Sequence, residues 1–134
     1  MNPHLFVYGT LLSTAGHPKG ARLQREARPI GAASIPGRLY RIKHYPGLVE
    51  GTDPKELVHG EVHALNNPVS ALTWLDAYEG IVPGAHDRNE YERVERPVRL
   101  ASGEHQITAW VYLYRKDVAR FRLIPDGRWG SAPP

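Results

Sequence analysis

The chain of 134 residues contains no cysteine at all. It therefore has no disulfide, no thiolate nucleophile and no cysteine-ligated zinc site. It also has no apolar run long enough to cross a membrane. Residues 1–4 do not start a signal peptide, because no apolar stretch follows a basic beginning there. These absences predict a cytoplasmic protein without a membrane partner.

The chain has little excess charge of either sign, with 17 Lys and Arg residues against 14 Asp and Glu residues. The basic residues, mostly arginines, alternate with acidic ones and form no block. Proteins that bind nucleic acids usually concentrate positive charge on one face. We therefore expect no nucleic-acid partner, although a mildly basic surface favours an anionic small-molecule substrate. The sequence does not indicate the oligomeric state.

Three common site motifs are incomplete. His59 and His63 have the spacing of a helical metal pair, but in a strand they lie roughly 13 Å apart, too far to share one ion. Residues 9–16 begin and end with glycine but lack the Gly-Lys-Ser/Thr ending of a phosphate-binding loop. Ser13 and Ser34 are not in the Gly-x-Ser-x-Gly setting of a hydrolase nucleophile. We expect no metal and no cofactor.

What the chain has in abundance is glycine and proline, 13 and 12 residues respectively, which favour short elements and many turns. Length predicts one domain, placed at residues 1–124, with a Gly- and Pro-rich C-terminal tail at 125–134 that lies over the surface or frays. Periodicity predicts strands at 4–8, 30–42, 57–65, 91–100 and 106–114, helices at 19–27 and 67–79, a turn at 45–47, and a short element at 119–124.

The predicted strands alternate in a way that favours an α+β fold, mostly antiparallel and closed into a small β-barrel. In the strand 57–65, Val58 and Val62 belong to the core face, whereas His59, Glu61 and His63 are predicted to be outward polar residues.

Glu79 is the most informative residue, because a carboxylate occupies a position that points to the core. Asn67 and Pro68 open its helix and Gly80 ends it. At about 100° per residue, Glu79 projects within about 20° of Leu72. Burial and the negative end of the helix dipole would raise its pKa, as a general base requires. The alternative is a side chain that turns out to solvent from a frayed last turn.

A second candidate feature is the turn Tyr8-Gly9-Thr10-Leu11 at the end of the first strand. Glycine there lets a ligand approach the backbone, and the N–H groups of Thr10 and Leu11 could hold an anion or a developing oxyanion. An ordinary strand-ending turn is the alternative.

Three further side chains are candidates for substrate contacts: Arg93, Tyr45 and Tyr114. Arg93 lies on the face opposite Val94 and could bind a substrate carboxylate, or could simply be solvated. Tyr45, Tyr91 and Tyr114 are either cavity walls or core aromatics with satisfied hydroxyls.

Taken together, the chain resembles the gamma-glutamylcyclotransferase-like family, and its first motif is most like that of the gamma-glutamylamine cyclotransferase branch. The matching segments, in order, are Phe6-Val7-Tyr8-Gly9-Thr10-Leu11, residues 36–40, residues 45–49, residues 60–62, Leu75-Asp76-Ala77-Tyr78-Glu79-Gly80, residues 91–94 and residues 110–112. The resemblance implies a small β-barrel with flanking helices.

It also implies cyclisation of a γ-glutamyl group to 5-oxoproline, with release of the attached amine or amino acid. By the resemblance, Tyr8 to Leu11 forms the substrate-holding loop and Glu79 accepts the proton. The α-amino group of the substrate attacks its own γ-carbonyl, so the protein needs neither a nucleophile nor a cofactor. The alternative, from a different class, is a non-catalytic protein of the same fold that binds an amino-acid-like ligand.

Overall fold

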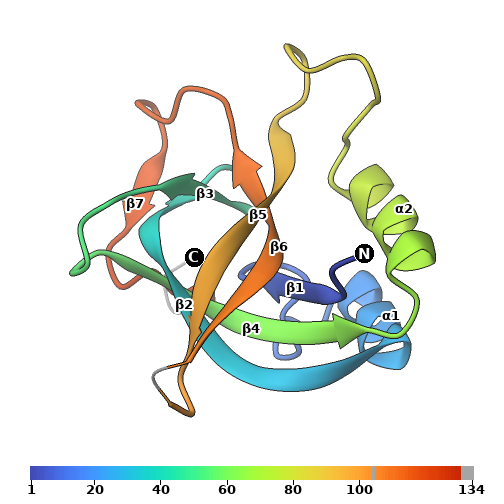
Figure 1. Ribbon diagram of the computed structural model, residues 1–134. Coiled ribbons are helices and arrows are strands. Elements are labelled where there is room, and N and C mark those ends of the chain that lie inside the picture. Colours follow the sequence, from blue (N-terminus) through green and yellow to red (C-terminus); the bar gives the residue numbers. More distant parts are fainter. Residues whose placement is uncertain (104, 131–134) are drawn as a thin grey trace.

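The computed structural model describes residues 1–103 and 105–130 and contains a mixed β-barrel flanked by two helices (Figure 1). The helices are α1 (Pro18–Glu26) and α2 (Pro68–Tyr78). The strands are β1 (His4–Val7), β2 (Ala27–Arg41), β3 (Pro46–Glu50), β4 (Leu57–Leu65), β5 (Tyr91–Leu100), β6 (Gln106–Tyr114) and β7 (Arg122–Ile124).

Five strands form the barrel in the order β2-β4-β1-β6-β5, and pairing of β2 with β5 closes it. Only the pairing of β1 with β6 is parallel among the strands described; the remaining pairs are antiparallel. The predicted α+β class and small, mostly antiparallel barrel are thereby confirmed. β2 is long enough to pair with β4 and β5 and then, beyond them, with β3 and β7.

β1 runs through the middle of the molecule and is buried on both faces. Leu5 and Val7 join the apolar cluster under the helices, whereas Phe6 and Tyr8 join the cluster inside the barrel. Successive strand residues point to opposite faces, so one short apolar strand serves both clusters. The end of β1 is therefore held firmly in place, which matters for the turn that follows it.

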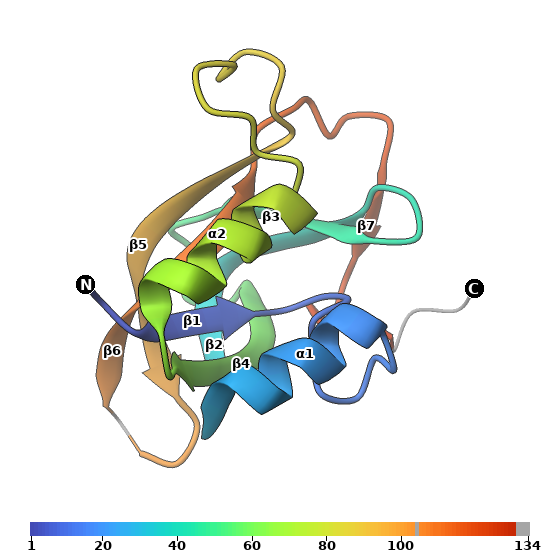
Figure 2. The same ribbon diagram turned by 90° about the vertical axis from the view of Figure 1, so that its right-hand side faces the viewer.

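The two helices cover the same side of the barrel, as the two views in Figures 1 and 2 agree. α2 begins as predicted, with Asn67 Oδ1 accepting the Ser70 N–H at 3.2 Å and Pro68 in the first turn. α1 begins after His17, whose Nδ1 accepts the Lys19 N–H at 3.0 Å. α2 buries Ala71, Leu72 and Leu75 against the barrel, which fixes its rotation about its own axis.

The turn predicted at 45–47 was wrong, and strand β3 was missed. The chain turns at 42–45, where the N–H groups of Ile42 and Lys43 both donate to the Tyr45 carbonyl. Pro46 then starts β3, since proline is tolerated as the first residue of a strand. Gly47 is needed there because a Cβ would lie 2.7 Å from Cγ of Tyr114.

The prediction that His63 is an outward polar residue was also wrong, because its exposed fraction is only 3%. The loop before α1 covers this face of β4, where both the N–H and the hydroxyl of Ser13 donate to Glu61. His63 Nε2 lies 3.1 Å from the same carboxylate, whereas His63 Nδ1 is buried without a partner among the described residues. Strand periodicity correctly put His63 on the face of β4 opposite Val58 and Val62. It could not show that this face is buried, because the loop that covers it comes from another part of the chain.

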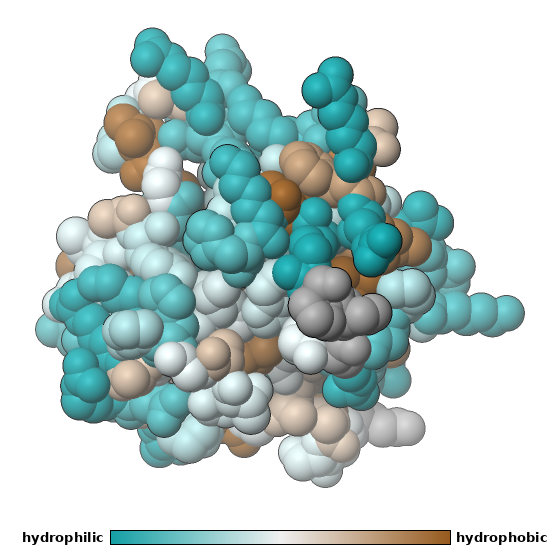
Figure 3. Space-filling model, turned by 180° about the vertical axis from the view of Figure 1, so that it is seen from behind, coloured by the Kyte–Doolittle hydropathy of each residue, from teal (hydrophilic) through white to brown (hydrophobic). Residues whose placement is uncertain are grey.

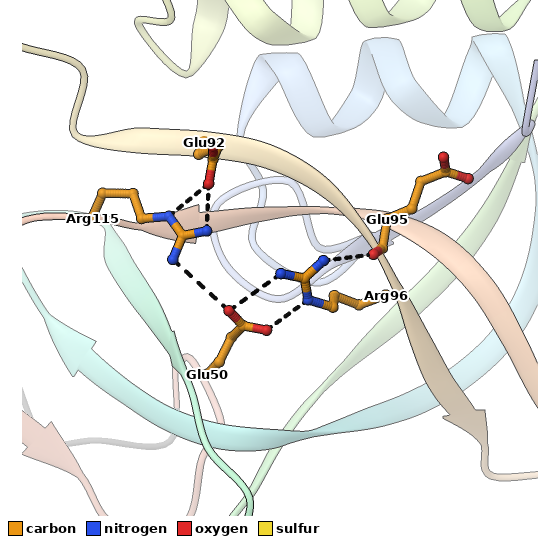
Figure 4. Close-up of polar contacts among 5 residues, drawn as sticks. All are labelled: Glu50, Glu92, Glu95, Arg96 and Arg115. Atoms are coloured by element: carbon orange, nitrogen blue, oxygen red, sulfur yellow. Dashed lines mark hydrogen bonds and ion pairs between the residues drawn. The ribbon is translucent and has the colours of Figure 1, made fainter. Parts of the chain in front are cut away.

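An ion-pair network on the outside of the barrel joins β3 to β5 and to the residue after β6 (Figure 4). Glu50 lies between Arg96, at 2.6 Å, and Arg115, at 3.8 Å, and Arg115 also pairs with Glu92. These side chains are largely exposed, so each pair contributes at most about 1 kcal/mol to stability.

Hydrophobic residues on the face shown in Figure 3 form small, separate patches among hydrophilic ones. Isolated exposed apolar side chains of this kind are ordinary on a protein surface. Within residues 1–103 and 105–130, no helix is long and apolar enough to span a membrane.

The first part of the predicted tail, residues 125–130, lies against the barrel. The His59 N–H donates to the Gly127 carbonyl at 2.9 Å, and Arg41 stacks on the Trp129 ring at 4.6 Å. Gly127 has φ +66°, and a Cβ there would lie 1.9 Å from the Leu57 carbonyl oxygen. Residues 131–134 are outside the described part of the chain, and the domain division after residue 124 stays a prediction.

Candidate active site

A cavity of about 250 Å³ lies where the end of β1, the end of α2, the start of β3 and the start of β5 meet. It is lined by Phe6, Val7, Tyr8, Gly9, Thr10, Leu11, His44, Tyr45, Pro46, Tyr78, Glu79, Gly80, Glu90, Tyr91 and Tyr112. Both features singled out in the sequence, the turn after β1 and Glu79, therefore face one space.

The way α2 ends places Glu79 at the cavity. Glu79 is the C-cap residue, and Gly80 follows in the left-handed conformation with φ +74°. The Gly80 N–H donates to the Ala77 carbonyl at 3.1 Å and the Ile81 N–H to the Asp76 carbonyl at 2.9 Å. These two bonds form a Schellman motif, which glycine favours because it has no Cβ to clash. The last turn is thus fixed, and the alternative of a frayed helix end does not apply.

The carboxyl group of Glu79 is in an unusual electrostatic environment. Burial raises its pKa from 4.5 to about 8, and the negative charge of Asp76 adds to the effect. Among the described residues, no hydrogen bond or ion pair engages this carboxyl group. It is therefore able to exchange a proton near neutral pH.

The carboxyl group of Asp76, unlike that of Glu79 three residues later, has several hydrogen-bond partners. It accepts hydrogen bonds from Arg93 Nε at 2.7 Å, Arg93 Nη2 at 3.1 Å and the Tyr112 hydroxyl at 2.6 Å. Arg93 also stacks on the Trp110 ring at 4.3 Å. The guanidinium group is thus committed to Asp76 and leaves Glu79 without a cationic partner.

The turn after β1 closes through the Leu12 N–H, which donates to the Gly9 carbonyl at 3.0 Å. The N–H groups of Thr10 and Leu11 donate to no group in the described part of the protein. Pro46 packs directly on the turn, and a Cβ on Gly9 would lie 2.6 Å from Cγ of Pro46. The turn can therefore offer two backbone donors to an anionic group in the cavity.

A side-chain contact links this turn to α2. The Thr10 hydroxyl lies 2.6 Å from the Tyr78 hydroxyl, and His17 Nε2 lies 3.5 Å from the same tyrosine oxygen. Since Tyr78 is adjacent to Glu79 in sequence, the contact fixes the backbone donors relative to the carboxyl group.

Tyrosine rings form much of the cavity wall. The Tyr8 hydroxyl donates to the Tyr112 carbonyl and the Tyr91 hydroxyl to the Pro46 carbonyl, both at 2.5 Å. Burial raises the pKa of Tyr8 and of Tyr91 well above its ordinary value, and the charge of Glu79 adds to both shifts. These hydroxyls are neutral and already bonded, so the two rings act as walls.

Two of the candidate substrate contacts do not line the cavity. Arg93 hydrogen-bonds to Asp76 and stacks on the Trp110 ring, and it does not line the cavity. Its predicted contact with a substrate carboxylate therefore lacks structural support. Tyr114 packs on Gly47 and on the Tyr91 ring, 5.4 Å between centroids, behind the cavity wall. Tyr45 does line the cavity, as do Tyr8, Gly9, Thr10 and Leu11.

Sequence reasoning missed four lining residues that carry polar groups: His44, Tyr78, Glu90 and Tyr112. Glu90 immediately precedes β5, and the Tyr45 hydroxyl donates to its carboxylate at 3.0 and 3.2 Å. No local pattern identified Glu90, because its position depends on how the long loop after α2 returns to the barrel. Within the described residues, no three His, Cys, Asp or Glu side chains are grouped so that they could hold a metal ion.

Comparisons with known proteins agree with this geometry. The model of a family described as "Gamma-glutamyl cyclotransferase, AIG2-like" matches residues 5–131. The chain is 32% identical over 126 residues to the gamma-glutamylcyclotransferase family protein YtfP of Escherichia coli (strain K12), covering 93% of this chain and 94% of that protein.

Two solved structures show the same fold. The solution structure of protein ytfP from Escherichia coli aligns with a TM-score of 0.62 at 31% identity, covering 96% of each chain. The crystal structure of an AIG2-like protein from Mus musculus aligns with a TM-score of 0.73 over 98% of this chain and 90% of that one. The identity to the mouse protein is 21%, so that match bears on the fold alone.

Proposed function

This chain belongs to the gamma-glutamyl cyclotransferase, AIG2-like family, and we propose that it converts a γ-glutamyl amine or γ-glutamyl amino acid to 5-oxoproline and a free amine. One observation carries the proposal. Glu79, Thr10 and Leu11 line one small cavity, and within the described residues neither the Glu79 carboxyl group nor the N–H groups of Thr10 and Leu11 have a hydrogen-bond partner.

In the proposed reaction, the α-nitrogen of the substrate attacks its own γ-carbonyl carbon. The new C–N bond closes the five-membered lactam, and the bond to the leaving amine breaks. The α-nitrogen loses two protons as the ammonium group becomes the lactam N–H, and the leaving nitrogen gains two as the amide N–H becomes an ammonium group. Glu79 accepts a proton from the first nitrogen and donates it to the second in each of these transfers, so no proton is gained or lost overall. A carboxyl group with its pKa raised to about 8 can carry out both transfers near neutral pH.

The turn after β1 supplies the electrostatic part of the proposed mechanism. The Thr10 and Leu11 N–H groups would bind either the substrate α-carboxylate or the oxyanion that develops on the γ-carbonyl oxygen. Backbone donors held by the Pro46 contact and by the Thr10–Tyr78 hydrogen bond need no reorganisation during the reaction.

The shape of the cavity suits a small, folded substrate. Its volume, about 250 Å³, is slightly below the range of typical small-molecule sites, which begins near 300 Å³. A confined wall of tyrosine rings favours the bent conformation in which the α-nitrogen meets the γ-carbonyl. Such proximity lowers the barrier by several kcal/mol.

The test is incubation of the purified protein with a panel of γ-glutamyl amines and γ-glutamyl dipeptides, with 5-oxoproline measured by mass spectrometry. At least one compound should yield 5-oxoproline. Glu79→Gln should reduce kcat by about 100-fold or more, because the amide keeps the shape but cannot accept the proton. Glu92→Gln, at an exposed carboxylate outside the cavity, is the control and should retain activity.

Binding of panel compounds without any product would contradict the proposal. That result would favour the alternative of a non-catalytic protein with an amino-acid-like ligand. Full activity of Glu79→Gln would instead remove Glu79 from the mechanism and leave the cyclotransferase activity in place.

A further inference from the structure

We propose that Glu90 makes this cavity selective for γ-glutamyl amines whose leaving amine carries a second, distal positive charge, as in the conjugate of a diamine. The inference rests on the proposed function and adds to it the chemical class of the leaving group. It arises from the charges that line the cavity and from the way Glu90 is held.

Glu90 reaches the cavity because the loop after α2 folds back on itself. The buried side chain of Asn89 ties the two ends of this loop together, accepting the Val82 N–H and donating to the Val82 carbonyl, each at 3.1 Å. The Arg115 N–H donates to the Glu90 carbonyl at 2.7 Å and fixes Glu90 to the end of β6. These contacts bring Glu79 and Glu90 to the same cavity from opposite ends of one loop.

The Glu90 carboxylate is itself oriented. The hydroxyl of Tyr45, the residue before β3, donates to its two oxygens at 3.0 and 3.2 Å. Burial raises the pKa of Tyr45 to about 12, and the hydrogen bond and charge of Glu90 add to it, so this phenol is a neutral donor. Within the described residues, no Lys, Arg or His side chain pairs with Glu90. Its negative charge is thus available to a ligand.

The sign of the charge in the cavity decides which leaving group fits. Glu79 and Glu90 line it, and no Lys or Arg is among its described lining residues. Arg93, three residues after Glu90 on β5, is already paired with Asp76. The backbone donors of the turn after β1 are needed for the glutamyl part of the substrate. A leaving group with a carboxylate would therefore meet no lysine or arginine among the described lining residues, and His44 is the one imidazole there, whereas a distal ammonium group would meet Glu90.

Three γ-glutamyl conjugates of matched length test this proposal: those of a four-carbon diamine, of neutral pentylamine and of the anionic ω-aminopentanoate. The diamine conjugate should have a kcat/KM about 10-fold above that of the pentylamine conjugate, the size expected for a partly exposed charge-assisted hydrogen bond. The ω-aminopentanoate conjugate should be the poorest of the three. The preference for the diamine should weaken as salt is added.

Variants then assign the preference to Glu90. Glu90→Gln should reduce the diamine preference, measured as the ratio of the kcat/KM values of the diamine and pentylamine conjugates, to within about 2-fold, and Glu90→Lys should reverse the order of the charged conjugates. Tyr45→Phe, which frees the Glu90 carboxylate without removing it, should weaken the preference partly. Glu92→Gln, two residues along and outside the cavity, is the matched control and should keep the wild-type preference.

Equal kcat/KM values for all three conjugates in the wild-type protein would overturn this inference and leave the proposed function standing. Loss of turnover of all three conjugates by a folded Glu90→Gln protein would also overturn it, because Glu90 would then take part in the chemistry common to them. If none of the three conjugates yields 5-oxoproline, and the wider panel yields none either, the proposed function fails together with the inference.

Discussion

Asp76 and Glu79 show how strongly the surroundings of a carboxyl group decide what it can do. The two lie three residues apart near the end of α2, yet Asp76 has three donated hydrogen bonds and Glu79 has none in the described part of the chain. The guanidinium group of Arg93 stabilises the negative charge of Asp76. Among the described residues, Glu79 lies beside no such cation, so its protonated form is favoured and its pKa is raised. A single helical turn thus holds both a structural and a candidate catalytic carboxyl group.

The pH dependence of activity follows from this pair. We expect kcat/KM to rise with pH about a midpoint near 8, because Glu79 must be ionised to accept a proton. Asp76→Asn should move the midpoint lower by roughly one unit, since it removes a negative neighbour and leaves the positive charge of Arg93 unbalanced. The titration of the substrate amine is common to both proteins and cancels in the comparison. An unchanged midpoint in pH–rate profiles would contradict this assignment.

The same group should make stability depend on pH. The pKa of Glu79 is about 8 in the folded protein, above its ordinary 4.5, so the folded state binds the proton more tightly. Its contribution to stability is fully present below pH 4.5 and is lost as pH rises through about 8, with a slope of at most about 1.4 kcal/mol per pH unit.

Urea unfolding of the wild-type protein and of Glu79→Gln at several pH values measures this contribution. Glu79→Gln should become relatively more stable as pH rises from 5 to about 9, because the amide has no charge to bury. A difference in unfolding free energy that is independent of pH would show that Glu79 has an ordinary pKa in the folded state.

At the scale of elements, the site depends on a connection between the turn after β1 and the last turn of α2. The hydrogen bond between Thr10 and Tyr78 is the direct link, and the N-cap residue of α1, His17, approaches the same hydroxyl. The turn is also tied to β4 on its far side, where Ser13 donates to Glu61. Contacts with α2, with the N-cap residue of α1 and with β4 therefore fix the position of the turn after β1, and of its backbone N–H groups, relative to Glu79.

A double-mutant cycle tests this link. Thr10→Val and Tyr78→Phe each remove one hydroxyl and keep the volume, and each should lower kcat/KM by about 10-fold. The double variant should be no worse than either single one, because both remove the same hydrogen bond. The measurement is steady-state kinetics on the best panel substrate, with thermal unfolding to verify that each variant is folded. Additive losses would mean that the two hydroxyls act separately.

At the scale of the whole molecule, closure of the barrel brings together parts of the chain that are far apart in sequence. Pairing of β2 with the end of β5 closes the barrel, and pairing of Tyr91 with Tyr114 of β6 sets where β5 begins and hence where Glu90 lies. The parallel pairing of β1 with β6 places the turn after β1 beside Tyr112. The loop between α2 and β5 connects these two elements, with Glu79 as its first residue and Glu90 as its last, and both of these residues line the cavity.

The sequence by itself determined the elements that have a strong local pattern. β4, β5 and β6 have the predicted bounds, and α2 begins after the predicted cap Asn67 and ends at Tyr78, with Gly80 following its C-cap residue. The direction of Glu79 followed from helical geometry alone, and the turn after β1 followed from a glycine at the end of an apolar strand. These features depend on neighbours within a few residues, so the local chain contains the information.

Only the tertiary structure decided the rest. Strand β3 forms because β2 extends beyond the barrel to pair with it, His63 is buried because a distant loop covers it, and Arg93 is occupied because α2 presents Asp76 to it. Glu90 reaches the cavity through contacts of Asn89 with Val82 and of Arg115 with its own backbone. Each outcome depends on contacts between parts of the chain that lie apart in sequence, and the local residue pattern does not contain them.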